Sequence, residues 1–139
     1  MKVLILEDED ILRKVLVRTL RNAGFQVIDA ACIRDADTIL SKERIDLIVS
    51  DIGLPDGNGL DFFREVHERF PEIFGIVMTA QNSRENQLAA KKMGIETFFT
   101  KPVCLKDLKD VIFRLDCRRV DLGDETLGNA PLDTLQKLC

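Results

Sequence analysis

The amino-acid sequence predicts an α/β fold, a doubly wound parallel sheet of five strands with helices on both faces. The first observation is a set of five short runs rich in Val, Ile, Leu and Phe, several of them apolar on both faces, as buried parallel strands are. The second is that a segment with apolar residues at helical spacing follows each run. Such alternation predicts parallel strands joined by right-handed helical crossovers.

The predicted elements follow one another in regular order along the chain. The first helix has apolar side chains that recur at helical spacing up to Gly24, a residue that suits a left-handed helix terminator. Gly94 follows the fourth helix in the same way. The strands are predicted at residues 2–6, 25–30, 46–50, 74–79 and 97–100, and the helices at 11–23, 34–42, 60–70, 83–93 and 106–119.

The length and composition predict one domain followed by a short tail. A chain of 139 residues with 45% hydrophobic and 32% charged residues can bury a sizeable core, and we assign the domain to residues 1–120. From residue 121 to 139, glycines, Asn129 and Pro131 are scattered among acids, which is typical of a linker or tail. This stretch has room for a short helix near 132–138, and the alternative is a partner-binding or dimerising segment.

The charge balance indicates protein partners. A formal net charge of -4 argues against a general affinity for nucleic acid or anionic membranes, so we expect no direct nucleic-acid binding in this segment. The first apolar run is broken at once by the acids at 7–10, and neither a signal peptide nor a membrane span fits the sequence, which predicts a cytoplasmic location. The four cysteines form no C-x-x-C pair, and we expect them to be reduced and structural.

Polar side chains stand at the carboxyl ends of the predicted strands. Glu7 and Asp8 close the first strand, Asp51 follows the third, Thr79 closes the fourth and Lys101 follows the fifth. In an open α/β sheet these ends meet at one edge, where ligands bind at the point at which the strand order reverses. Three carboxylates in one place repel one another and favour a bound cation, and oxygen donors with room for water suit magnesium.

The same residues could support phosphoryl transfer to a carboxylate. An Asp51 nucleophile attacking phosphorus needs neutralised charge, which the metal and the Lys101 ammonium could supply, while the Thr79 hydroxyl could donate to a phosphoryl oxygen. No Walker-type Gly-rich loop follows the first strand, so the sequence does not predict a bound nucleotide.

Four segments together resemble the receiver domains of bacterial two-component response regulators. They are E-D-E-D after the first strand, D-I-G-L-P-D-G-N-G from Asp51, M-T-A from Met78 and F-F-T-K-P ending at Pro102. The resemblance spans residues 1 to about 119 and implies a flavodoxin-like sheet with the strand order 2-1-3-4-5.

The resemblance implies roles for the acids. Asp51 resembles the family's phosphoacceptor, and Asp8 its direct ligand to Mg²⁺ or Mn²⁺. The carbonyl of Gly53 matches the backbone metal ligand, and Glu7 matches the acid that acts on the metal through water. Glu stands at position 7 where the family more often has Asp, and the extra methylene could alter metal affinity while phosphorylation survives.

The resemblance also implies a switch. Thr79 and Phe98 match the hydroxyl and aromatic pair that move on phosphorylation, although an aromatic at a strand end is as readily a static core residue. Lys101 matches the active-site lysine, and Pro102 a proline that follows a cis peptide bond. Val103 replaces a frequent Phe, which we interpret as a packing change.

The expected function is therefore a phosphorylation-dependent signalling switch. A sensor histidine kinase or phosphotransfer protein would donate to Asp51, and the domain would change its partner binding, or form a homodimer through the fourth helix, fifth strand and fifth helix. It would not be a conventional enzyme, beyond slow self-dephosphorylation. The alternative is a pseudo-receiver that binds partners without phosphorylation. An Asp-nucleophile hydrolase is disfavoured, because Gly53 stands where such an enzyme has a second acid.

Overall fold

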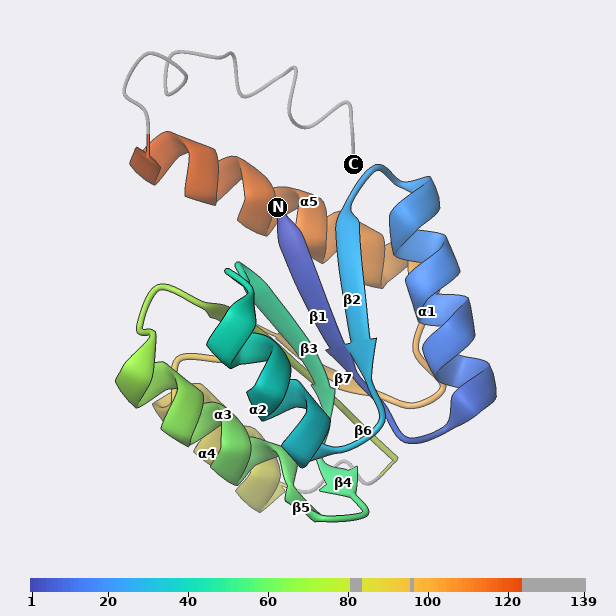
Figure 1. Ribbon diagram of the computed structural model, residues 1–139, viewed down its shortest axis with the longest axis vertical. Helices are drawn as coiled ribbons and strands as arrows, with labels where there is room; N and C mark the ends of the chain where they lie inside the picture. Colours follow the sequence, from blue (N-terminus) through green and yellow to red (C-terminus); the bar gives the residue numbers. More distant parts are fainter. Residues whose placement is uncertain (81–83, 96, 124–139) are drawn as a thin grey trace. The chain divides into compact units, whose positions relative to one another are not determined.

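The protein has a five-stranded parallel sheet (Figure 1). The computed structural model describes residues 1–80, 84–95 and 97–123. The chain divides into two units, Met1–Val103 and Cys104–Cys139. The sheet lies in the first unit. Its strands are β1 (Lys2–Leu6), β2 (Gln26–Ala30), β3 (Leu47–Asp51), β6 (Phe74–Thr79) and β7 (Thr97–Thr100).

The strand order is β2-β1-β3-β6-β7, and every neighbouring pair is parallel. Because β4 and β5 form a separate small sheet, this is the predicted order 2-1-3-4-5 of the main strands. The predicted fold class is therefore confirmed. The order reverses between β1 and β3, so the carboxyl ends of these two strands form the crevice in which such sheets bind ligands.

The helices begin and end close to the predicted positions. They are α1 (Asp10–Asn22), α2 (Ile33–Lys42), α3 (Gly59–Arg69) and α4 (Arg84–Lys92) in the first unit, and α5 (Leu105–Gly123) in the second. Gly24 has φ +98, the left-handed conformation predicted for it, and its N–H donates to the carbonyl of Arg21. Ser83, at the predicted start of the fourth helix, lies outside the described residues.

The fifth helix is longer than predicted. It continues past Arg119 to Gly123, so the first residues of the predicted tail are helical. Val120 to Leu122 include neither proline nor glycine, the two residue types with the least helix propensity, so the helix continues as far as Gly123, the last described residue there. The short helix predicted near residues 132–138 lies outside the described part of the chain.

One face of the sheet packs on α2, α3 and α4. A buried cluster joins strand residues such as Leu4, Leu6 and Ile48 to helix residues such as Leu40 and Phe63. Successive strand side chains point to opposite faces, so Val3, Ile5 and Val49 face the other way, the side on which α1 buries Leu16 and Leu20. The two strands whose ends form the crevice, β1 and β3, are therefore buried on both faces of the sheet.

Two further observations concern the cysteines and the apolar character of the helices. Of the cysteines in the described residues, Cys32 and Cys104 have free thiols, and Cys139 lies outside that range. Within the described residues no helix combines the length and the apolar character that a membrane crossing requires.

Candidate functional site

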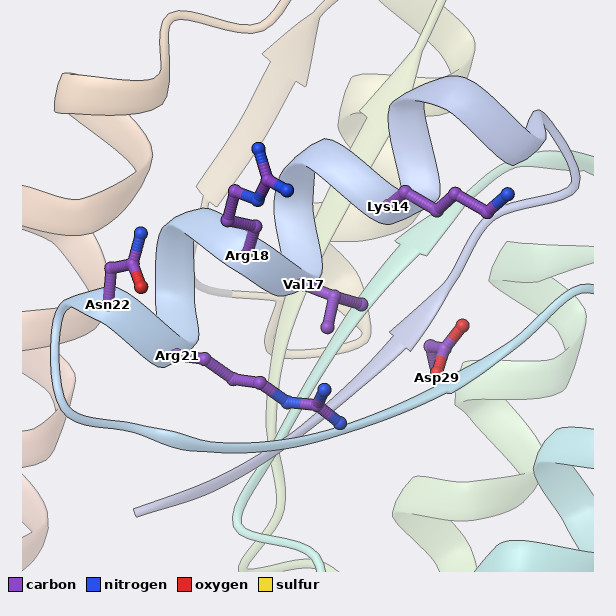
Figure 2. A pocket seen from close by; sticks show the side chains of 6 residues that line it. All are labelled: Lys14, Val17, Arg18, Arg21, Asn22 and Asp29. Carbon is purple, nitrogen blue, oxygen red and sulfur yellow. The ribbon is translucent and has the colours of Figure 1, made fainter.

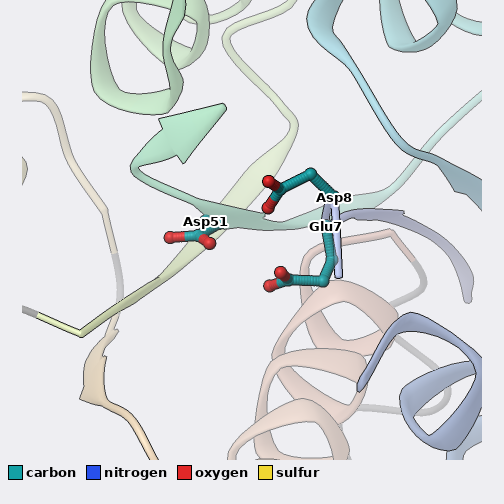
Figure 3. Close-up of side chains that lie close together, drawn as sticks. All are labelled: Glu7, Asp8 and Asp51. Carbon is teal, nitrogen blue, oxygen red and sulfur yellow. The ribbon is translucent and has the colours of Figure 1, made fainter. Parts of the chain in front are cut away.

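The predicted acids converge at the carboxyl edge of the sheet. Glu7 and Asp8 follow β1, Asp51 ends β3, and the two strands are neighbours with Leu6 opposite Ser50. One carboxylate oxygen from each of the three acids lies within 4.8 Å of the others. Figure 3 shows Glu7 and Asp8 leaving one turn and reaching towards Asp51. Glu7 and Asp51 are buried, whereas Asp8 is exposed to solvent.

Lys101 supplies the cation of this group. Its Nζ donates to Asp51 Oδ2 at 2.8 Å and to Glu7 Oε1 at 3.2 Å. The Glu7 Oε2 atom lies 3.0 Å from the same Nζ, an ion-pair distance without hydrogen-bond alignment. The backbone N–H of Lys101 donates to the carbonyl of Thr79 at 2.7 Å, which ties this loop to the end of β6. The Lys101–Pro102 peptide bond is cis, as the resemblance predicts.

Burial and charge shift the pKa values of this group. Burial raises the pKa of Glu7 above its ordinary value, and the charge of Asp51 adds to the rise, while hydrogen bonds from Lys101 and the Glu9 N–H oppose it. For Lys101, burial alone would lower the pKa, but the hydrogen bonds to Asp51 and Glu7 outweigh it, so the pKa of the ammonium is raised. Lys101 therefore stays charged and offsets the repulsion between the two buried carboxylates.

The donor set fits a hard divalent cation. Three carboxylates offer only oxygen atoms, and the exposed side of Asp8 leaves room for the water ligands that magnesium retains. Within the described part of the chain the buried Glu7 Oε2 accepts no hydrogen bond and has only the ion-pair contact with Lys101, so it can also face a cation or a water bound to one. The residues at this edge could therefore hold a magnesium ion.

Thr79 and Phe98 lie on neighbouring strands. Thr79 is buried at the end of β6 opposite Thr100, and Phe98 of β7 is opposite Val77. Phe98 is half-buried and packs against the buried cluster on the α2, α3 and α4 side of the sheet. The register therefore sets the Phe98 backbone back from that of Thr79 along the strands, and Phe98 is neither fully in the core nor fully exposed.

The loop after Asp51 is a hairpin that the sequence analysis did not predict. β4 (Gly53–Leu54) pairs antiparallel with β5 (Gly57–Asn58), and Gly53 is opposite Asn58. The hairpin closes next to Asp51, because the Gly59 N–H donates to the carbonyl of the following residue, Ile52, at 2.7 Å. A Cβ on Gly59 would lie 2.0 Å from the Asp51 carbonyl oxygen, so only glycine fits there.

Two side chains of the hairpin cap helices. Asn58 Oδ1 accepts from the Leu60 N–H at 2.8 Å and so caps α3. The Asp56 carboxylate accepts from the N–H groups of Ile33 at 2.8 Å and Arg34 at 3.0 Å, which caps α2 from a distant part of the chain. Backbone hydrogen bonds from Arg34 and Ile33 lower the pKa of Asp56. The Asn-Gly and Asp-Gly pairs were the available sequence signals, since both are typical of tight turns.

Comparison with known proteins assigns the family. The model of the response regulator receiver domain matches residues 3–113. The chain is 34% identical over 136 residues to the response regulator protein PilR of Pseudomonas aeruginosa, an alignment that covers 94% of this chain and 31% of PilR.

Solved structures agree with this assignment. The chain is similar to a CheY-like response regulator receiver domain protein from Methanospirillum hungatei, with a TM-score of 0.80 and 26% identity, covering 86% of this chain and 97% of that one. It is also similar to the beryllofluoride-activated NtrC4 receiver domain dimer, with a TM-score of 0.78 and 27% identity, covering 82% of this chain and 94% of that one.

The similarity to curated proteins concerns only part of their length. The chain spans between 23% and 61% of the lengths of several curated response regulators that it matches, so the activities of those whole proteins do not transfer to it directly. The family model, in contrast, covers most of this chain, including the ends of β1, β3 and β6 and Lys101. The chain belongs to the family of response regulator receiver domains.

Proposed function

We propose that this domain is a signalling switch that accepts a phosphoryl group on Asp51 from a sensor histidine kinase or a phosphotransfer protein. Receiver domains are signalling domains of two-component response regulators, not conventional enzymes, and they accept phosphoryl groups from histidine kinases. The observation that carries the proposal is the contact of 2.8 Å between Asp51 Oδ2 and the Lys101 ammonium, inside a group of carboxylates at the crevice edge.

In the proposed reaction a carboxylate oxygen of Asp51 attacks the phosphorus atom of a phosphohistidine. The new P–O bond forms as the P–N bond breaks, and the electron pair leaves with the imidazole, which takes up a proton. Lys101 moves its ammonium from the Asp51 carboxylate to a phosphoryl oxygen, where it offsets the incoming negative charge. The Thr79 hydroxyl donates to another phosphoryl oxygen. Slow hydrolysis of the acyl phosphate on the same domain resets the switch.

The metal site belongs to the same proposal. Asp8, Asp51 and the Gly53 carbonyl would hold Mg²⁺ or Mn²⁺, with Glu7 acting through a water molecule. When bound, the cation would neutralise charge on the incoming phosphoryl group. The all-oxygen donor set, and a Glu7 Oε2 that accepts no hydrogen bond from the described residues, support this assignment.

The output of the switch would be a population shift. Phosphorylation would draw Thr79 towards the new group, and Phe98, which is half-buried, would repack and change the affinity of the domain for a partner in the cytoplasm. Dimerisation through α4, β7 and α5 is one form of that output. The similarity to an activated NtrC4 receiver domain that is a dimer supports it.

Intact mass after incubation with acetyl phosphate and magnesium tests the proposal. Wild type should gain one phosphoryl group, and Asp51→Asn should gain none. Asp61→Asn, which changes an exposed carboxylate on α3, is the matched control and should gain one group as wild type does. An unmodified wild-type mass, with magnesium binding established, would instead favour the pseudo-receiver that binds partners without phosphorylation.

A further inference from the structure

Arg13 of α1 joins three segments that meet beside the acid turn, which we define as residues 7–10. Its Nη1 donates to the carbonyl oxygen of Glu7 at 3.0 Å, and its Nε to Asp29 Oδ2 at 3.0 Å. Its Nη2 donates to Asp10 Oδ1 at 2.6 Å. The side chain is only 14% exposed. One guanidinium therefore connects the end of β1, the end of β2 and the first turn of α1.

The hydrogen bond from Arg13 to Glu7 is important because its acceptor is a backbone carbonyl between two acids. This carbonyl belongs to the peptide that links Glu7 to Asp8, the two consecutive acids of the proposed metal site. The Glu7 N–H is already fixed on the Ala30 carbonyl at 3.1 Å. A donor on the carbonyl side fixes the second half of the turn, so the orientation of both side chains depends on where the guanidinium lies.

Within the described residues, the other hydrogen bonds made by the backbone of this turn before α1 involve the Glu7 and Glu9 N–H groups and the Glu9 carbonyl, not the Glu7 carbonyl. Glu9 is the N-cap residue of α1, but its side chain makes no capping hydrogen bond. The Glu9 N–H donates to Glu7 Oε1 at 3.1 Å, a contact that a metal ion would share or replace. Arg13 contacts the peptide carbonyl and not the carboxylates of the metal site, so its hold on the turn is compatible with a cation bound there.

We propose that Arg13 is a positioning residue, which sets the Glu7 and Asp8 carboxylates in the arrangement that binds the divalent cation. The proposal rests on the proposed function, which places the metal on these acids. Groups that orient metal ligands from outside the coordination sphere typically change metal affinity by about 10- to 100-fold when they are removed. Arg13 would act through the Glu7 carbonyl and would not touch the ion.

Charge alone predicts the opposite sign. A cation near the site repels a metal ion, so removing the Arg13 charge would tighten magnesium binding if electrostatics were its only effect. A positioning role predicts that removing Arg13 weakens magnesium binding. Arg13→Lys separates the two further, because a lysine keeps the charge but is a compact donor without the planar fork of a guanidinium.

The neighbouring basic residues of α1 provide matched controls. Figure 2 shows the side chains that line a groove of about 400 Å³, from α1 and from Asp29 of β2: Lys14, Val17, Arg18, Arg21, Asn22 and Asp29. Arg21 donates to the Val27 carbonyl at 3.0 Å, so it also ties α1 to a backbone carbonyl, but of β2 and not of the acid turn. Arg18 is an exposed arginine of the same helix.

The test is the magnesium dependence of the thermal unfolding midpoint, followed by circular dichroism. Each variant is compared with its own metal-free state, so a general loss of stability does not enter the result. Arg13→Ala should raise the half-saturating magnesium concentration about tenfold. Arg13→Lys should raise it by less, while Arg18→Ala and Arg21→Ala should bind as wild type does. Asp8→Ala should show no magnesium effect.

The outcomes separate the two proposals. Equal or tighter magnesium binding by Arg13→Ala, with a normal wild-type response, would overturn the role of Arg13 and leave the metal site standing. No magnesium response in wild type would overturn the metal site and this inference together. If Arg13→Ala does not fold, Arg13→Lys carries the test, and wild-type affinity in that variant would reject positioning by the guanidinium.

Discussion

The Lys101 ammonium lies within 3.2 Å of both carboxylate oxygens of Glu7, a side chain with no exposed surface. Glu7 is thus a buried acid whose charge is stabilised by the Lys101 ammonium and by the Glu9 N–H. Lys101 also contacts Asp51 and is itself only 15% exposed. The stability of the folded domain around Glu7 and Asp51 therefore depends on Lys101, and so does the chemistry proposed for these residues.

Lys101→Met should destabilise the domain. It leaves Glu7 and Asp51 close together without their cation, and removing one partner of a buried ion pair costs about 3 kcal/mol. Denaturant unfolding in metal-free buffer measures the loss. The double variant Glu7→Gln with Lys101→Met should recover most of it, because it removes the more deeply buried charge and its repulsion of Asp51. An undiminished loss in the double variant would contradict the pairing.

The raised pKa of Glu7 predicts a specific pH dependence. Because the folded-state pKa lies above 4.5, the native state binds more protons than the unfolded state between 4.5 and the raised value. The contribution of Glu7 to the free energy of unfolding is therefore complete below 4.5 and is lost as the pH rises through the folded pKa. Relative to wild type, Glu7→Gln should gain stability with rising pH, by at most about 1.4 kcal/mol per pH unit.

Denaturant unfolding of wild type and Glu7→Gln over this pH range, without metal, gives the comparison. The difference between the two proteins isolates Glu7 from the other carboxylates. A difference that does not change with pH would mean that burial does not raise the pKa of Glu7.

Two glycines of the loop after Asp51 should respond in opposite ways to alanine. A Cβ at Gly59 would lie 2.0 Å from the Asp51 carbonyl oxygen, whereas a Cβ at Gly53 meets no atom within 4 Å. Gly59→Ala should therefore cost about 3 kcal/mol of unfolding free energy, the upper range for an overpacked site. Gly53→Ala should change it by less than about 1 kcal/mol. Equal effects in denaturant unfolding would show that the hairpin can move away from Asp51.

Asp56 should stabilise α2 only while it is ionised. Its pKa is lowered by the Arg34 and Ile33 N–H groups, so its contribution is present above the ordinary value of 3.8 and is lost as the pH falls through the lowered pKa. Asp56→Ala should lower the melting temperature by a few degrees at neutral pH. As the pH is lowered through the folded-state pKa of Asp56, the melting temperatures of the two proteins should converge. A difference that persists in acid would point to a role other than capping.

The sheet and the meeting of the acids could be predicted from the sequence. Buried parallel strands leave long apolar runs, and a polar residue at the carboxyl end of a run must lie at the same edge as its counterparts. This is how Glu7, Asp51 and Lys101 were expected together, and their distances agree. The assigned roles of these residues, and the movement of Thr79 and Phe98, stay predictions.

The hairpin, the capping of α2 by Asp56 and the bond from Arg13 to Glu7 could not be predicted in the same way. β4 and β5 have two residues each, too few for any periodicity. Asp56 caps a helix that begins more than twenty residues earlier, a contact fixed only by the tertiary fold. Arg13 stands three residues after Asp10, a spacing that on its own indicates an ordinary surface pair on a helix. Its bond to the Glu7 carbonyl depends on how the chain turns into α1.

The contact between Lys101 and Asp51 also bears on the charge balance of the three acids. Three carboxylates against one ammonium leave an excess of negative charge that one divalent ion would balance. Conversely, while Lys101 occupies Asp51 Oδ2, that oxygen is shielded from an incoming electrophile. For the proposed transfer to use this oxygen, the ammonium would have to leave it first, so uptake of a divalent ion and release of Lys101 from Asp51 would be coupled.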